Sequence, residues 1–166
     1  MHAPDPHAAQ PFARINQTRT GAWRNVKCVA VPPEDELFLE EPWVVIRWDS
    51  AHNCVHTEWK AFANSAEFRG ALLRALEAIK EKRAASYLGD GRKVKVIVRE
   101  DQEWVNEVWI PLAAAAGLKR VALVTAASGL GRGNVEDAVK LVDNRLLLMH
   151  SFDSVDAAQK WLSETD

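Results

Sequence analysis

Hydrophobic and polar positions alternate along two neighbouring stretches of the chain, residues 43–49 and 53–59. Alternation with a period of two is typical of a β-strand that has one buried face. The intervening residues, DSAHN, are rich in turn formers. We therefore expect a hairpin, whose first strand runs antiparallel at or near the edge of a sheet.

Apolar residues then recur at helical spacing and predict a helix over about residues 65–83. Asn64 and Glu67 stand three residues apart at its start, which is the spacing of a capping box. The last helix of the chain is expected to begin after Asp153 or Ser154, either of which can act as an N-cap.

A further helix is expected to begin at Asp101 as its cap and to end before Gly117. Pro111 lies inside this segment. Because proline lacks a backbone N–H and crowds the preceding turn, we predict a kink or a break between Val108 and Leu112.

Short apolar stretches predict the remaining strands at residues 85–88, 119–125 and 145–150, with a Gly-rich loop and a helix over about residues 135–143 before the last strand. The expected order is ββαβαβαβα. Alternating helices and apolar strands predict an α/β fold, with a single mixed, mostly parallel sheet and helices on its faces. We expect strands 119–125 and 145–150 to be parallel and central or near-central.

The chain has 166 residues, which suits one domain, here expected over residues 43–166. Residues 1–42 are interpreted as a partly irregular N-terminal extension, with one possible strand at residues 26–31. A net charge of −2 gives no electrostatic reason to expect nucleic acid as a partner. No stretch approaches the about 18 apolar residues of a membrane span. The start lacks the apolar core of a signal peptide, and the lone Cys28 and Cys54 favour a reducing compartment, so a cytoplasmic protein is expected.

The order of elements, with the segments TEWKAF, LGDGR, DQEW, GLKRVALV and SFDSVDAAQKWL, resembles the STAS-like fold of the anti-sigma-factor antagonists. It is more closely similar to the uncharacterised bacterial STAS/SEC14-type proteins grouped with them. The resemblance covers roughly residues 43–162 and implies a module that acts by binding. In the antagonists, a Ser after the third strand is phosphorylated. The corresponding stretch here, GDGRKVKVIVRED, has no Ser or Thr, so no hydroxyl is available there for such a switch.

Ligands of open α/β sheets bind outside the carboxyl ends of the strands. The residues proposed to form a ligand- or partner-binding site at that edge are Asp90, Arg92, Trp59, Trp104, Ser128 and His150. In one interpretation, Asp90 and Arg92 line a concavity that has Trp59 or Trp104 in its wall. In the other, Asp90–Gly91 is a turn dipeptide and Arg92 is a solvated side chain.

Other chemistry is poorly supported by the sequence, and no catalytic residue, metal site or cofactor is predicted. His52 and His56 have no further ligand at metal-binding spacing. The glycines of SGLGRGN match neither the dinucleotide fingerprint nor a P-loop. Most of the seven tryptophans are expected in the core, with one or two at an interface.

Three functions therefore stay open. The first is a non-enzymatic STAS-like binding or regulatory module, whose partner is a protein or a small apolar ligand, with a homodimer allowed. The second is an enzyme that uses Asp90, Arg92 and His150 at the strand ends. The third is a lipid carrier, as the SEC14 side of the resemblance implies.

Overall fold

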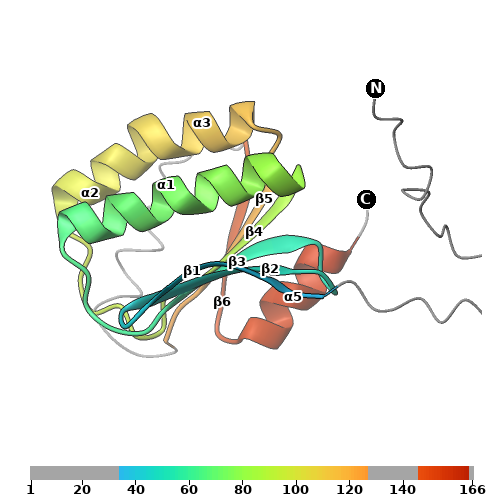
Figure 1. Ribbon diagram of the computed structural model, residues 1–166, viewed down its shortest axis with the longest axis horizontal. Helices are drawn as coiled ribbons and strands as arrows, with labels where there is room; N and C mark the ends of the chain where they lie inside the picture. Colours follow the sequence, from blue (N-terminus) through green and yellow to red (C-terminus); the bar gives the residue numbers. More distant parts are fainter. Residues whose placement is uncertain (1–33, 127–145, 165–166) are drawn as a thin grey trace, which may run out of the picture. The chain divides into compact units, whose positions relative to one another are not determined.

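The computed structural model of the protein describes residues 34–126 and 146–164, which include one six-stranded sheet (Figure 1). Its strands are β1 (Glu36–Glu41), β2 (Val44–Asp49), β3 (Cys54–Trp59), β4 (Ser86–Asp90), β5 (Arg120–Val124) and β6 (Leu148–Phe152), and they lie in this order across the sheet. The pairs β1–β2 and β2–β3 are antiparallel, while β3 to β6 run parallel. The expected α/β fold with one mixed sheet is confirmed.

The hairpin predicted from the alternating pattern is present, with Val44 opposite Trp59 and Asp49 opposite Cys54. The strand β1, which pairs with β2 at the edge, was not expected. Its register shifts between Leu37 and Leu39, as at a β-bulge. A bulge breaks the alternation of inward and outward side chains, so the sequence pattern of a strand is lost here.

The position of β6 corrects one expectation. This strand is parallel to β5 as predicted, but within the described sheet it is the last strand and not a central one. Consistent with this edge position, Leu146 and Leu148 are about half exposed. Three strands precede α1, where the expected order ββαβαβαβα has two. The possible strand at residues 26–31 and the helix expected at residues 135–143 lie outside the described residues, so that part of the order stays a prediction.

The described helices lie on both faces of the sheet (Figure 1). One face carries α1 (Ser65–Lys82) and a composite helix made of α2 (Arg99–Trp104), the π-helical turn η1 (Val105–Trp109) and α3 (Ile110–Ala115). The other face carries α5 (Val155–Ser163), which packs against β4, β5 and β6. Among the described residues, no helix is both long and apolar enough to cross a membrane.

Two of the three predicted side-chain caps are confirmed. The Asn64 side chain accepts a hydrogen bond from the Glu67 N–H at 3.0 Å, and the Glu67 carboxylate accepts one from the Asn64 N–H at 2.9 Å. Ser154 Oγ accepts a hydrogen bond from the Ala157 N–H at 3.2 Å and begins α5. Each cap satisfies backbone N–H groups that the first helical turn leaves without a partner.

The composite helix differs from its prediction at its start. Asp101 is not the N-cap, because α2 begins at Arg99 and its cap residue is Val98. The Asp101 carboxylate instead accepts a hydrogen bond from Arg69 Nε of α1 at 2.7 Å. This ion pair links the two helices, which a pattern within one segment does not indicate.

The helical bonding before Pro111 is interrupted by the π-helical turn η1, which lies mostly before the interval Val108–Leu112 where a kink or a break was predicted. The Ile110 N–H donates to the Val105 carbonyl, five residues back, and Pro111 follows near the start of α3. Because Pro111 has no N–H to give to the carbonyl four residues back, a wider turn before it accommodates the gap in the bonding pattern. The helix α3 ends at Ala115 with Ala116 as its cap residue, and Gly117 follows with a φ of 103°, which suits glycine.

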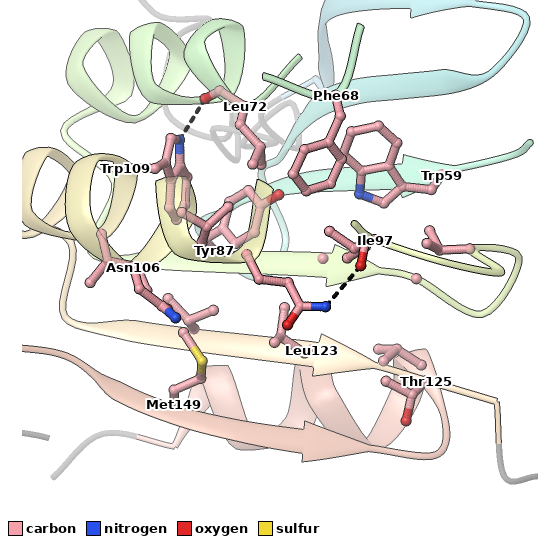
Figure 2. A pocket seen from close by; sticks show the side chains of 18 of the residues that line it. Trp59, Phe68, Leu72, Tyr87, Ile97, Asn106, Trp109, Leu123, Thr125 and Met149 are labelled. Carbon is pink, nitrogen blue, oxygen red and sulfur yellow. Dashed lines mark hydrogen bonds between the residues drawn. The ribbon is translucent and has the colours of Figure 1, made fainter. Parts of the chain in front are cut away.

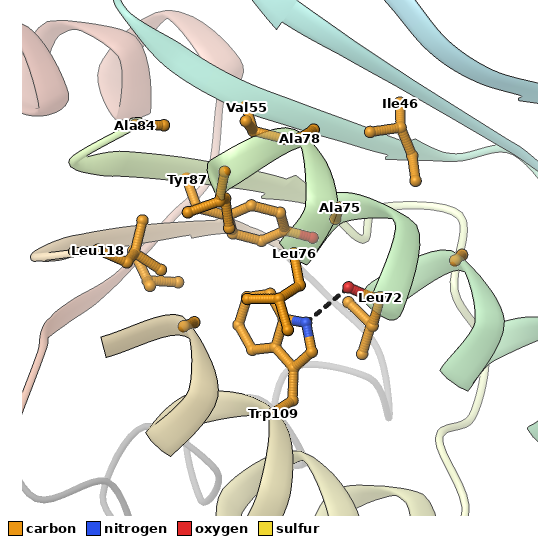
Figure 3. Close-up of a cluster of buried hydrophobic side chains, with 14 of the residues drawn as sticks. Ile46, Val55, Leu72, Ala75, Leu76, Ala78, Ala84, Tyr87, Trp109 and Leu118 are labelled. Atoms are coloured by element: carbon orange, nitrogen blue, oxygen red, sulfur yellow. Dashed lines mark hydrogen bonds between the residues drawn. The ribbon is translucent and has the colours of Figure 1, made fainter. Parts of the chain in front are cut away.

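The larger core lies between the sheet and the helices α1, η1 and α3 (Figure 3). Trp109 reaches from η1 toward α1, and its indole N–H donates to the Leu72 carbonyl at 2.7 Å. This bond satisfies the polar atom of a residue that is only 2% exposed. A smaller core on the other face joins Leu88 and Val124 of the sheet to Leu162 of α5.

The tryptophans largely follow their prediction. Trp59 and Trp109 are buried, and the other four in the described residues are partly buried and pack against one of the two cores. Trp23 lies outside the described residues. Cys54 is fully buried and free, and burial, with a contribution from Asp49, raises the pKa of its thiol to about 12.

Candidate binding cavity

An apolar cavity of about 130 Å³ lies between the sheet and the helices of the larger core, toward the carboxyl ends of β3, β4 and β5 (Figure 2). Its walls include Trp59 of β3, Phe68 and Leu72 of α1, Tyr87 and Gly89 of β4, Val105, Asn106 and Trp109 of η1, and Val121 and Leu123 of β5. The cavity is thus assembled from elements that are distant in the sequence.

Gly89 makes room on the sheet side of the cavity. A Cβ atom at this position would lie 3.0 Å from Leu123 Cδ2 and 3.3 Å from Tyr87 Cε1. Both of those side chains line the same cavity. A larger residue at this position would therefore displace the Leu123 side chain.

One side of the cavity is formed by the segment of residues 91–98, which follows β4. Its first residue is fixed to β5, because the Gly91 N–H donates to the Val124 carbonyl at 2.8 Å. Near its other end, the Ile97 carbonyl accepts a hydrogen bond from the Gln102 side chain of α2 at 2.8 Å (Figure 2). Between these anchors, Val94 and Ile97 are partly buried while Val96 is 56% exposed.

A second cavity of about 190 Å³ adjoins the first and shares Trp59, Phe68 and part of the 91–98 segment with it. Phe62 and Val98 also line this cavity and are themselves exposed. Its one acidic lining residue, Asp101, is paired with Arg69. Apolar lining therefore continues from the inner cavity to the surface.

Aromatic rings form much of the inner wall. Trp59 and Phe68 stack with their ring centroids 5.1 Å apart, and Tyr87 meets Trp109 edge-on at 5.3 Å. Burial raises the pKa of the Tyr87 hydroxyl to about 12, so this group is neutral at physiological pH. Such walls favour an apolar ligand and set its orientation through ring contacts.

Few polar groups line the inner cavity. The amide oxygen Oδ1 of Asn106 is buried and has no hydrogen-bond partner among the described residues. Thr125 is 5% exposed, and the Gln102 amide already donates to Ile97. Lys95, the charged residue of the lining, is exposed. The polar groups named in the wall of this cavity, other than Lys95, are amides and a hydroxyl, which carry no charge.

Asp90 and Arg92 do not line either of these two cavities. Side chains alternate along β4, so Tyr87 and Gly89 face the cavity while Leu88 and Asp90 face the side of the sheet on which α5 packs. The structure therefore does not bring Asp90 and Arg92 together with Trp59, because these side chains lie on opposite faces of the sheet. A binding role for Asp90 and Arg92 stays a prediction.

The Asp90 carboxylate is held by Arg92 through three hydrogen bonds. The guanidinium donates from Nε at 2.9 Å and from a terminal nitrogen at 2.7 Å, and the Arg92 backbone N–H donates at 3.2 Å. Burial by itself would raise the pKa of Asp90, but these bonds and the positive charge bring it below its ordinary value. The geometry is that of a turn stabilised by its own side chain.

His56 lies on the same face as Asp90 and is 3% exposed. Its Nδ1 is 3.1 Å from a terminal nitrogen of Arg47, which can only donate, so the proton of the neutral ring is on Nε2. Nε2 has no hydrogen-bond partner among the described residues. Burial and the Arg47 charge lower the pKa of His56, and the ring is held neutral.

The remaining predicted site residues are dispersed. Trp104 does not line the cavities and packs under the Arg69 guanidinium, 5.4 Å from its ring centroid. His150 lies in the middle of β6, with its ring 4.9 Å from that of Trp161. Ser128 lies outside the described residues. Of the five that the structure describes, only Trp59 lines the cavity.

Sequence reasoning missed most of the cavity, including Phe68, Leu72, Tyr87 and Trp109. These residues were assigned to ordinary core positions or left unassigned. The available signal was small: Tyr87 and Gly89 share a strand face, and a glycine among large residues indicates space. No group of three or more His, Cys, Asp or Glu side chains that could hold a metal ion occurs in residues 34–126 and 146–164.

Comparison of the chain with protein-family models, with curated proteins and with solved structures finds no match.

Proposed function

We propose that this domain is a non-enzymatic binding module whose ligand is a small apolar molecule held in the inner cavity. The observation that carries the proposal is the aromatic-walled space of about 130 Å³ beneath the 91–98 segment. Native cores contain few voids larger than a water molecule. An apolar space of this size is close to the roughly 150 Å³ engineered cavity that binds benzene.

The position of the cavity supports the same proposal. It lies toward the carboxyl ends of parallel strands, where ligands of open α/β sheets bind. The adjoining cavity shares Trp59 and Phe68 with it and is also lined by exposed Phe62. The volume favours a compact molecule over a long acyl chain, so the small-ligand form of the proposal is preferred to a lipid carrier.

An enzyme built on Asp90 and Arg92 is less well supported. Catalysis needs several polar groups that converge on one reacting atom. Here the Asp90 oxygens accept hydrogen bonds from Arg92, and His150 lies on another strand. Membership of the STAS-like class stays a proposal, supported by the mixed sheet with helices on both faces.

Binding of toluene, a neutral apolar probe, tests the proposal by isothermal titration calorimetry. Val94 lines both cavities from the 91–98 segment, so Val94→Trp should fill the space and abolish binding. Leu73→Trp is the matched control, because Leu73 is 44% exposed on α1 and lines neither cavity. We expect this control to bind toluene as the unsubstituted protein does.

A second blocked variant, Val105→Phe, approaches the cavity from η1 and serves if Val94→Trp does not fold. Circular dichroism establishes that each variant is folded. Absence of toluene binding to the unsubstituted protein, or binding that survives in both folded blocked variants, would contradict the proposed function.

A further inference from the structure

We propose that the surface around the outer cavity docks on an anionic lipid bilayer. This docking surface combines exposed apolar and exposed cationic side chains, which are Phe62, Val96, Val98, Lys60, Lys93 and Lys95. It lies on the outside of the domain and does not require a ligand in the inner cavity. The proposal can therefore be tested separately from the proposed function.

The apolar part of the docking surface is formed by two segments that are distant in the sequence. Phe62, which follows β3, is 70% exposed, and Val96 and Val98, which follow β4, are about half exposed. All three line the outer cavity, so they are neighbours in space. Figure 1 shows both segments at the end of the sheet where α1 and α2 begin. Exposed apolar side chains that are grouped in this way mark an interaction surface.

Exposed lysines accompany these apolar side chains. Lys60 precedes Phe62 by two residues, and Lys93 and Lys95 alternate with valines in the 91–98 segment. Lys95 also lines the outer cavity. None of the three lysines forms an ion pair within the part of the chain that the structure describes. Their charges are therefore available to an anionic partner.

Neighbouring carboxylates do not cancel this positive charge. Within residues 60–64 and 91–104 the acidic side chains all lie on α2. Asp101 pairs with Arg69 at 2.7 Å, and Glu103 pairs with Arg99 at 2.8 Å. Only Glu100 has no ion pair among the described residues, so the lysines outnumber the available carboxylates three to one. The docking surface is positive although the chain as a whole carries a net charge of −2.

The mixture of lysine and apolar side chains favours a bilayer over a protein partner. Lysine is depleted in protein–protein interfaces, where it would lose its hydration. At a bilayer surface a lysine stem lies along the apolar region while its ammonium group stays among the lipid phosphates. Anionic lipids attract such groups, and an exposed ring such as that of Phe62 can enter the boundary between head groups and acyl chains.

Vesicle flotation of the full chain tests the proposal. We expect the protein to float with vesicles of phosphatidylserine and phosphatidylcholine in equal parts, and to bind vesicles of phosphatidylcholine alone much more weakly. Added sodium chloride should weaken binding to the mixed vesicles, because salt screens exposed charges. Equal binding to both kinds of vesicle would overturn the proposal.

The charged part of the docking surface is tested by the double variant Lys93→Gln with Lys95→Gln. It should bind the mixed vesicles about twentyfold more weakly, because each lysine near an anionic surface contributes a factor of roughly five. The matched control is Lys80→Gln with Lys119→Gln, which removes two exposed lysines that lie elsewhere. This control should bind as the unsubstituted protein does.

The apolar part is tested at unchanged charge by Phe62→Ser, which should weaken binding about tenfold because the ring no longer enters the bilayer. Leu73→Ser, on the exposed side of α1, is the matched control and should bind normally. Circular dichroism establishes that each variant is folded. Unchanged binding by either docking-surface variant, or an equal loss in its control, would overturn the proposal.

Absence of binding to the mixed vesicles would also overturn the proposal and would favour a protein partner for this surface. That result would leave the proposed function intact if toluene still binds in the inner cavity. Conversely, vesicle binding without toluene binding would support the docking surface and contradict the proposed function.

Discussion

Asp90 ends β4 on the sheet face that does not contact the cavity, and its bonds to Arg92 lead us to expect a structural role. Asp90 is 5% exposed. Its carboxylate accepts three hydrogen bonds from Arg92. A buried carboxylate with a bidentate arginine is strongly held in place. Substitution of Asp90 should therefore change stability, and it should leave ligand binding in the cavity unchanged.

Asp90→Asn should lower the free energy of unfolding at pH 7 by about 1–2 kcal/mol, because a buried charge-assisted pair is lost. Since the folded-state pKa of Asp90 is lowered, this contribution is present above the unfolded-state value of 3.8 and is lost as the pH falls through the lower folded-state value. Urea denaturation measures both effects. Glu40→Gln, on an exposed carboxylate, is the control and should stay within about 0.5 kcal/mol. An Asp90→Asn variant of unchanged stability would show that the pair is not structural.

The buried His56 predicts a pH dependence on the acid side of neutrality. Its folded-state pKa is lowered, so the folded protein resists protonation that the unfolded chain accepts below the ordinary value of 6.5. Stability should therefore fall as the pH decreases from 6.5 toward the folded-state pKa, by up to about 1.4 kcal/mol per pH unit. In His56→Gln the fall between pH 7.5 and 5.5 should be smaller. Equal slopes in both proteins would contradict this account of His56.

At the scale of single residues, the sequence allowed two interpretations of Asp90 and could not decide between them. The glycine-flanked Asp and the nearby Arg indicated a turn or a site. What distinguishes them is the direction of the side chain relative to the helices. Alternation placed Asp90 and Gly89 on opposite faces, but it could not say which face the helices α1 and α3 would cover. That depends on the handedness and packing of distant segments.

At the scale of elements, the helix starts with side-chain caps were predictable and the composite helix was only partly so. A capping box depends on residues three apart, so Asn64 and Glu67 indicate it locally. Pro111 similarly indicates an interruption. The form of that interruption depends on tertiary contacts, because the bond from Trp109 to Leu72 fixes how η1 sits against α1.

Two glycines give opposite expectations on substitution by alanine. Gly70 lies on the exposed side of α1, and a Cβ there meets nothing within 4 Å. Gly70→Ala should therefore stabilise the protein by roughly 0.5–1 kcal/mol, the usual cost of glycine in a helix. Gly89→Ala should destabilise it by about 1–3 kcal/mol, because the added methyl overpacks the wall against Leu123. Thermal or urea unfolding of both variants measures the contrast, and a neutral Gly89→Ala would contradict the packing described here.

At the scale of the whole described sheet, the alternation of strands and helices was sufficient to predict an α/β fold with parallel β5 and β6. It was insufficient for β1, whose bulge removes the alternating pattern, and for the edge position of β6. The cavity was beyond prediction for a related reason. Its walls come from segments between Trp59 and Met149, and its volume depends on how closely the helices approach the sheet.

The most direct test of the cavity as the binding site is a methyl-resolved NMR titration of the isotope-labelled protein with toluene. Methyl groups of Leu72, Ile97 and Leu123 line the cavity, while those of Leu88 and Leu162 belong to the core on the opposite face. We expect saturable shifts in the first group and unchanged positions in the second. No saturable shift at the cavity methyls, or shifts concentrated at Leu88 and Leu162, would contradict the proposed site.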